Sequence, residues 1–89
     1  MYTISNNSKY EIVIKNSKFI TLLYKITDVS KVDYILDNVK KEYPNATHYC
    51  YGYIIDNFKK SSDDKEPTGT AGIPILKVLE NNQLNYILA

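Results

Sequence analysis

The stretch Ser62–Leu76, which reads SDDKEPTGTAGIPIL, lies between a strand-like region and a helix-like region, and the rest of the chain is best interpreted from it. Pro74 stands near the predicted start of the helix, because a proline nitrogen needs no hydrogen-bond partner in a first turn. Free N–H groups at a helix N-terminus attract anions. The sequence therefore predicts an anion-binding loop at Thr68, Gly69, Thr70, Ala71 and Gly72. A helix cap with a tight turn would use the same residues.

The regions around this loop predict several strands. Residues 10–27 predict a hairpin, because Tyr10, Ile12 and Ile14 alternate with Glu11, Val13 and Lys15 in the manner of a half-buried strand. A turn at residues 16–18 leads to a second apolar run. Residues 47–55 predict another strand, and residues 84–89 predict the start of a further one. Residues 56–72 show no regular period, so we expect them to form a long polar connection.

Two helices are predicted as well. The first begins with Ser30 as the N-cap and with Val29 and Tyr34 at the positions of a hydrophobic staple, and it ends before Pro44. The second covers residues 73–80. The order strand, strand, helix, strand, loop, helix, strand predicts an α+β fold: a two-layer sandwich of a mostly antiparallel sheet with both helices on one face.

Length and composition describe one small domain spanning residues 1–89. The net charge is only +1, and all eleven basic residues are lysines, so the overall charge gives no argument for nucleic-acid binding. The N-terminus lacks the basic and apolar segments of a signal peptide, and Cys50 has no second cysteine to pair with. We expect a cytoplasmic protein.

Two groups of residues carry chemistry that catalysis or metal binding would need. Asp63, Asp64 and Glu66 could hold a hydrated Mg²⁺, but the same run is typical of a solvated turn, and no further ligand spacing supports a metal. His48 and Cys50 lie on one face of the predicted strand. A Cys–His nucleophile needs a closer approach, and the alternative is that His48 bonds to the acidic loop while Cys50 packs as a small apolar residue. We predict no cofactor, no metal and no catalytic residue.

Tyrosines on the same strand suggest a different function. Tyr49, Tyr51 and Tyr53 share one face, as in a platform on which single-stranded bases stack, and Lys59 and Lys60 follow nearby. Tyrosine is also a common strand residue with an apolar body and a polar tip. RNA binding on this face is therefore one hypothesis among several.

The same motifs carry a resemblance to a known family. Residues 46–51 (ATHYCY), residues 62–72 (SDDKEPTGTAG) and Pro74-Ile75-Leu76 resemble the amino-terminal domain of the IMPACT/YigZ family, and Glu11, Lys15, Ser17, Lys18 and Phe19 fit its opening strands. Lys65 stands where that family usually has glycine. The resemblance also implies that further sheet and a helix would follow Ala89, so the domain is expected to be incomplete.

The resemblance implies a fold like domain 2 of ribosomal protein S5. For eukaryotic members it implies a translation-linked regulator that binds the activator of a starvation-sensing kinase, whereas bacterial members have no settled biochemical role. We therefore expect a binding or regulatory module whose partner is a protein, RNA or the ribosome, and no membrane partner. The alternative is an enzyme acting on a phosphorylated or peptide-like substrate at Ser62–Gly72.

The C-terminal segment predicts self-association. Leu84, Tyr86 and Leu88 alternate with Asn85, Ile87 and Ala89, and no proline or charge protects this predicted strand. We expect a homodimer formed through an open edge at this strand.

Overall fold

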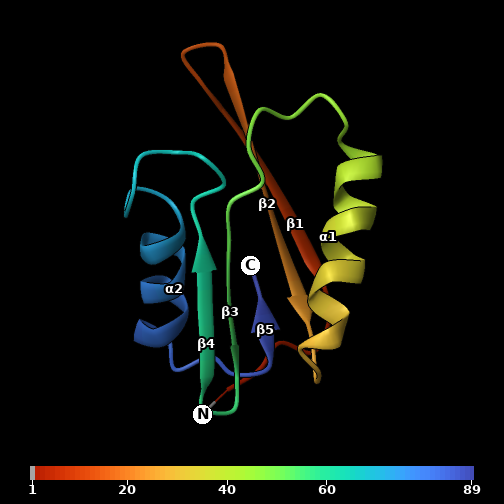
Figure 1. Cartoon of the computed structure of the whole chain (residues 1–89), viewed down its shortest axis with the longest axis vertical. Coiled ribbons are helices and arrows are strands. Elements are labelled where there is room, and N and C mark those ends of the chain that lie inside the picture. The colour runs from red at the N-terminus through yellow and green to blue at the C-terminus, as the bar shows by residue number, and fades with distance from the viewer. Residues whose placement is uncertain (1) are drawn as a thin grey trace.

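Five strands form one sheet in the computed structural model, which describes residues 2–89 (Figure 1). The sheet order is β1-β2-β5-β3-β4, and every neighbouring pair is antiparallel. The strands are β1 (Ser8–Ile14), β2 (Ser17–Lys25), β3 (Tyr51–Ile55), β4 (Phe58–Ser62) and β5 (Ile87–Leu88), and the helices are α1 (Ser30–Glu42) and α2 (Gly72–Asn81). The predicted α+β class is confirmed.

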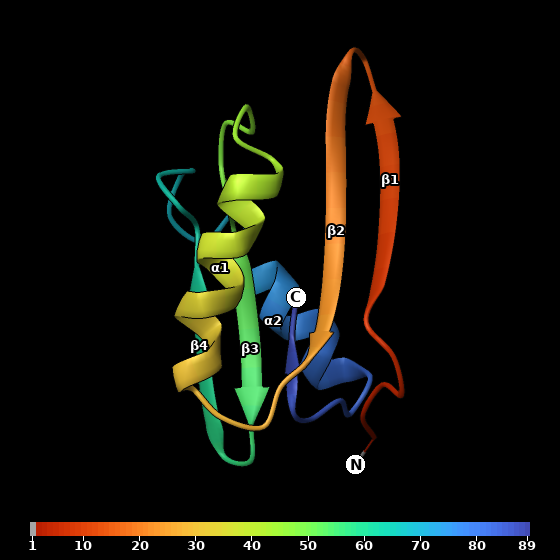
Figure 2. The same ribbon diagram turned by 90° about the vertical axis from the view of Figure 1, so that its right-hand side faces the viewer.

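The two helices cover opposite faces of this sheet (Figure 2). Tyr53 of β3 belongs to a buried cluster with Val32 of α1, whereas the next residue, Ile54, is buried with Leu79 of α2. Consecutive strand residues point to opposite faces, so two adjacent buried residues require a cover on each side. The prediction of both helices on one face is therefore wrong, and the fold has three layers.

Two glycines bring α2 close to the sheet. A Cβ atom on Gly72 would lie 2.7 Å from the backbone of Ser62, and one on Gly52 would lie 3.2 Å from the backbone nitrogen of Leu76. No real side chain tolerates the first distance. These glycines therefore allow α2 to lie directly on β3 and β4.

The predicted long connection after β3 is partly wrong, because Phe58–Ser62 forms β4. Asp56, which has a φ of 56°, and Asn57 make a two-residue turn, after which β4 pairs with β3 from Ile55↔Phe58 to Tyr51↔Ser62. The strand has four polar residues among five and lies at the sheet edge, so it lacks the apolar alternation of a half-buried strand.

The start of α1 also differs from the prediction. The side chain of Asp28 accepts a hydrogen bond from the Ser30 nitrogen at 3.0 Å, and Ser30 itself is the first helical residue. Val29 and Tyr34 are 42% and 68% exposed and form no staple. An aspartate oxygen accepts a hydrogen bond from a first-turn N–H as well as a serine oxygen does, so Asp28 takes the role that the sequence predicts for Ser30.

The predicted hairpin at residues 10–27 is confirmed as β1 and β2, but its turn is at Lys15 and Asn16 and not at residues 16–18, because Ser17 and Lys18 already pair with β1. The expectation that its first strand is half-buried is wrong, because all seven residues of β1 are exposed. The hairpin projects beyond the rest of the sheet (Figure 1).

Neither helix reaches the length and apolar character of a membrane span within residues 2–89.

The C-terminal strand lies inside the sheet. Leu88 of β5 is paired with Tyr24 of β2 on one side and with Tyr53 of β3 on the other, and both residues of β5 are buried. The expectation of an open edge here is therefore wrong, and the homodimer predicted through this strand loses its structural argument. Ala89 continues the pairing, with two hydrogen bonds of 2.9 Å to Gly52.

Candidate functional site

The loop between β4 and α2 lies against the residues that lead into β3. His48 and Cys50 enter from the β3 side, and Asp63, Asp64 and Glu66 enter from the loop. The structure thus brings together the histidine, the cysteine and the acidic residues that the sequence singled out. Their contacts decide what this cluster can do.

The carboxylate of Asp63 holds the loop by accepting hydrogen bonds from three of its backbone N–H groups. One oxygen accepts a hydrogen bond from the Gly69 nitrogen at 2.9 Å, and the other accepts bonds from the Ala71 and Gly72 nitrogens at 3.0 and 2.7 Å. The bonds from Gly69, Gly72 and Ala71 lower the pKa of Asp63 below its ordinary value of 3.8, because they stabilise the charged form. We call this set of bonds the Asp63 clamp.

The Asp63 clamp bears directly on the predicted anion site. Three N–H groups of the predicted loop, those of Gly69, Ala71 and Gly72, already donate to an anion that the chain itself provides. Thr70 donates from its backbone nitrogen and its hydroxyl to the Pro67 carbonyl. An external anion would have to displace the Asp63 carboxylate, so the geometry favours the cap-and-turn alternative, and anion binding stays a prediction.

Asp64 fastens the loop to the chain before β3. Its carboxylate accepts a hydrogen bond from the Tyr49 nitrogen at 2.6 Å, and its carbonyl oxygen lies 2.7 Å from Nδ1 of His48. A carbonyl oxygen can only accept, so Nδ1 carries the proton and donates. Nε2 of the same ring lies 3.5 Å from Oε1 of Glu66. The imidazole is therefore held between two acidic residues, with its side chain 30% exposed.

Lys65 occupies the turn position at which the family that this sequence resembles usually has glycine. Asp64 and Lys65 have φ angles of 43° and 70°, which glycine adopts freely and other residues adopt at a cost of about 1 kcal/mol each. The turn forms nevertheless, since the Glu66 nitrogen donates to the Asp63 carbonyl at 2.9 Å. Bonds made by the neighbouring aspartates offset the strain.

Cys50 is not arranged as a nucleophile. Its Sγ donates to the carbonyl oxygen of Asp63 at 3.2 Å. Burial raises the pKa of the Cys50 thiol, and the nearby carboxylates of Glu66, Asp64 and Asp63 raise it further. The thiol is thus protonated at neutral pH, and both nitrogens of His48 face the acidic loop. The cluster follows the structural alternative that the sequence left open.

No group of three histidine, cysteine, aspartate or glutamate side chains within residues 2–89 is arranged to hold a metal ion. The Asp63 carboxylate is used by the loop N–H groups, and that of Asp64 by the Tyr49 nitrogen. What the arrangement does is fix one conformation of the loop.

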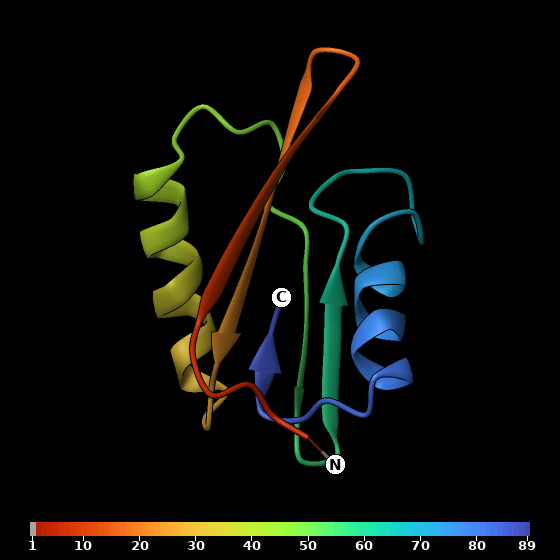
Figure 3. The same cartoon turned by 180° about the vertical axis from the view of Figure 1, so that it is seen from behind.

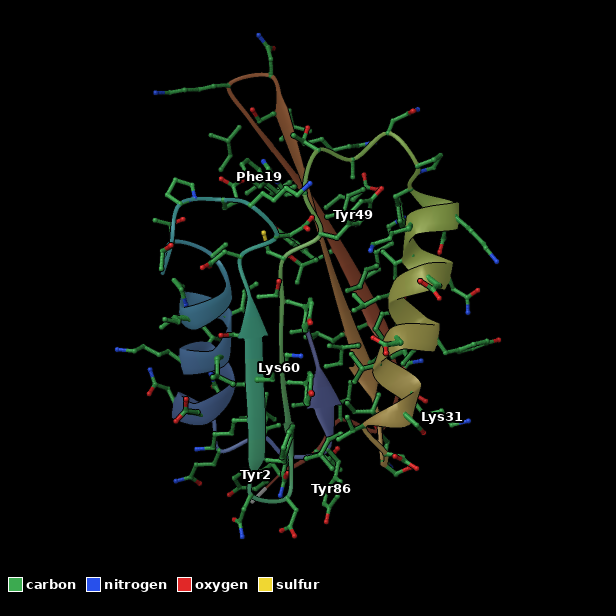
Figure 4. The ribbon with its side chains drawn as sticks, in the orientation of Figure 1. Tyr2, Phe19, Lys31, Tyr49, Lys60 and Tyr86 are labelled. Carbon is green, nitrogen blue, oxygen red and sulfur yellow. The ribbon has the colours of Figure 1, made fainter. Side chains whose placement is uncertain are left out.

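The burial of its residues argues against the predicted tyrosine platform, and RNA binding on this face stays a prediction. Tyr53 is only 3% exposed under α1, and the hydroxyl of Tyr49 donates to the Tyr43 carbonyl at the end of α1. Figure 4 shows Tyr49 between the chain before β3 and this helix. Tyr51 stacks on Tyr53, with ring centroids 6.3 Å apart. The three rings therefore do not form one exposed platform for bases.

The two lysines assigned to that surface are separated as well. Lys59 is opposite Ile54 and Lys60 is opposite Tyr53 in the β3–β4 ladder, so they point to opposite faces of the sheet. Lys59 forms an ion pair of 3.2 Å with Glu80 of α2. Strand alternation therefore divides a pair that looks like one basic patch in the sequence.

Sequence reasoning missed the role of two positions. The sequence pattern indicates only a metal ligand or a turn residue at Asp63, and it gives no signal for the close packing at Gly52. The signal for the Asp63 clamp is an aspartate followed six to nine residues later by loop glycines, whose N–H groups need an acceptor.

Comparisons with known proteins agree with this architecture. The model of the Impact N-terminal domain matches residues 15–89. YvyE of Bacillus subtilis, described as an IMPACT family member, is 38% identical over 86 residues, which are 93% of this chain and 40% of that protein. YigZ of Escherichia coli, also described as an IMPACT family member, is 36% identical over 81 residues, which are 85% of this chain and 40% of that protein.

A solved structure resembles the fold closely. The crystal structure of a protein described only as hypothetical superimposes with a TM-score of 0.90 at 30% identity, covering 94% of this chain and 43% of that one. The chain thus spans about two fifths of the length of the curated relatives that it matches. The family model covers most of the chain, including every residue of the clamped loop. The chain belongs to the IMPACT family.

Proposed function

We propose that this chain is a cytoplasmic binding module linked to translation, and that it recognises a protein or ribosomal partner through the clamped loop. The translational link rests on what the family resemblance implies for eukaryotic members. The observation that carries the binding role is the Asp63 clamp, which holds the loop in one conformation with three hydrogen bonds. A preorganised loop loses less conformational entropy when it binds.

The exposed residues of this loop form the proposed contact surface, which we call the loop surface: Lys65, Pro67, Thr68 and Thr70. The ammonium group of Lys65 has no ion-pair partner among the described residues. Proline and a rigid backbone add little entropy cost to binding. Behind the loop surface, His48 and Cys50 contact the backbone carbonyls of the two aspartates, whose carboxylates accept bonds from backbone N–H groups, so these residues shape the surface.

Co-sedimentation with purified bacterial ribosomes tests this proposal. We expect binding at about 0.1 M salt that weakens as salt rises, because a lysine contributes to it. A Lys65→Glu/Thr68→Arg variant should bind at least about ten-fold more weakly. Lys77→Glu is the matched control, since Lys77 is exposed on α2 outside the loop surface. Absence of binding at low salt would exclude the ribosome, and equal binding by the loop variant would exclude this surface.

An enzymatic role is the second candidate, and one observation favours it. The carbonyl of Asp64 orients His48 so that Nε2 is directed at Glu66 on a partly exposed side. An oriented imidazole beside a carboxylate is an arrangement used in general acid–base catalysis. His48→Gln separates the two candidates: an enzyme would lose turnover of a phosphate-ester or peptide substrate, whereas a binding module would show no turnover in either form.

A further inference from the structure

The outer edge of β1 is unpaired along all seven residues of the strand in the described structure. β1 is the first strand in the sheet order, and β2 is its only neighbour (Figure 2). Seen from behind, β1 lies in front of β2 (Figure 3). All seven of its residues, Ser8–Ile14, are exposed. A free strand edge presents unpaired N–H and C=O groups, which readily pair with another extended chain.

The side chains of β1 differ between its two faces. Ser8 is opposite Leu23, which packs in the cluster beneath α2, so Tyr10, Ile12 and Ile14 also lie on the α2 face. They are 65%, 41% and 51% exposed. The other face carries Lys9, Glu11 and Val13, so β1 combines an apolar row with a pair of opposite charges.

We propose that β1 pairs antiparallel with β1 of a second copy of this chain, forming a symmetric dimer with one continuous sheet. In the register with Tyr10 on the two-fold axis, Lys9 lies opposite the partner's Glu11, and Glu11 lies opposite the partner's Lys9. Opposite charges directly across two strands stabilise the pairing. The two tyrosines meet on the axis, where aromatic cross-strand pairs are also favourable.

Other registers lose this complementarity. With Glu11 on the axis, two glutamates face each other, and with Ile12 on the axis, Lys9 faces the partner's Lys15. Like charges directly opposite destabilise a ladder. Within one copy, Lys9 and Glu11 already lie close, with Nζ and Oε1 3.3 Å apart. The dimer would therefore extend an existing charge pair into an alternating row.

Charge reversal tests the proposal by sedimentation equilibrium from about ten micromolar to one millimolar. The parent chain should show a reversible monomer–dimer equilibrium. Glu11→Lys places lysines opposite lysines across the interface and should weaken the dimer at least about ten-fold. The double variant Lys9→Glu/Glu11→Lys exchanges the charges and should restore affinity to within about three-fold of the parent.

Two controls keep the test specific. Lys60→Glu lies on β4 at the opposite edge of the sheet and should leave the dimer unchanged. Circular dichroism of each variant checks that the monomer is folded. A parent chain that is monomeric throughout would overturn the proposal, and so would a Glu11→Lys dimer as tight as the parent's.

Cysteine cross-linking tests the register in a Cys50→Ser background. Tyr10→Cys should form an intermolecular disulfide, because residues opposite each other on the axis have Cα atoms about 4.5–5.5 Å apart. Ile12→Cys lies on the same face but away from the axis, beyond the reach of a disulfide in this register. Preferential cross-linking of Ile12→Cys would overturn the proposed register.

Discussion

The centre of the sheet, which lies between the two helices, and the β1–β2 hairpin bury their side chains to very different extents. In β3, Gly52, Tyr53 and Ile54 are buried between two helices, whereas every residue of β1 is exposed. β1 is paired with β2, and β3 with β4, along the whole length of β1 and of β3. Hydrogen-bonded pairing alone therefore does not make a region central to stability. Burial does, because apolar area removed from water contributes most of the stabilising free energy.

The same comparison separates the two outer strands. β4 is short and carries adjacent lysines, and α2 packs against it. β1 is longer, and its last three residues, Ile12, Val13 and Ile14, are exposed and apolar. Lysines on an edge strand discourage pairing with another chain. The structure thus protects one edge and leaves the other available.

The largest effect is expected where α2 meets β4. Gly72→Val should reduce the free energy of unfolding by about 4 kcal/mol, because the new Cβ would lie 2.7 Å from the Ser62 backbone and the two elements would have to separate. Gly69→Ala is the matched control. A Cβ there meets nothing within 4 Å, and its cost is about 1 kcal/mol from the positive φ of 79°. Urea unfolding measures both, and equal losses would contradict the close-packing argument.

The next largest difference in the free energy of unfolding is expected between two isoleucine-to-alanine changes, one at the centre of the sheet and one in the hairpin. Ile87 in β5 has no exposed surface, so Ile87→Ala should reduce the free energy of unfolding by about 3 kcal/mol. Ile12 in β1 is 41% exposed, and Ile12→Ala should cost less than about 1 kcal/mol. Thermal and urea unfolding at low protein concentration compare the monomers. Similar losses would mean that the hairpin is as much part of the core as β5 is.

The smallest effect concerns pH and the clamped loop. The pKa of Asp63 is lowered in the folded state, so its contribution to stability is present above pH 3.8 and is lost as pH falls through the lowered folded value. Asp63→Asn should therefore reduce stability at neutral pH and flatten the loss of stability on acidification. Asp37→Asn, an exposed change on α1, should keep the parent profile. Thermal unfolding from about pH 2 to 6 measures this, and parallel curves for Asp63→Asn and the parent would contradict the role of the clamp.

The sequence by itself determined the elements whose signals are local. Apolar alternation located the β1–β2 hairpin, helical spacing located α1, and the glycine and proline pattern placed α2 within one residue at each end. The resemblance carried by residues 46–51 and 62–76 identified the family. These signals lie within short stretches of chain, so a single sequence is enough to detect them.

Tertiary structure alone decided which surfaces are covered. The sequence could not place the helices on opposite faces, because an apolar strand residue looks the same under either helix. It could not show that Asp63 satisfies the N–H groups of Gly69, Ala71 and Gly72, since the loop had to close before that carboxylate met them. Nor could it place β5 between β2 and β3, because pairing partners far apart in the chain are set by non-local packing. The burial of the strands and the position of the open edge follow from contacts between segments that are distant in the sequence. The clamp spans only six to nine residues, but it depends on how the loop closes against β3 and α2.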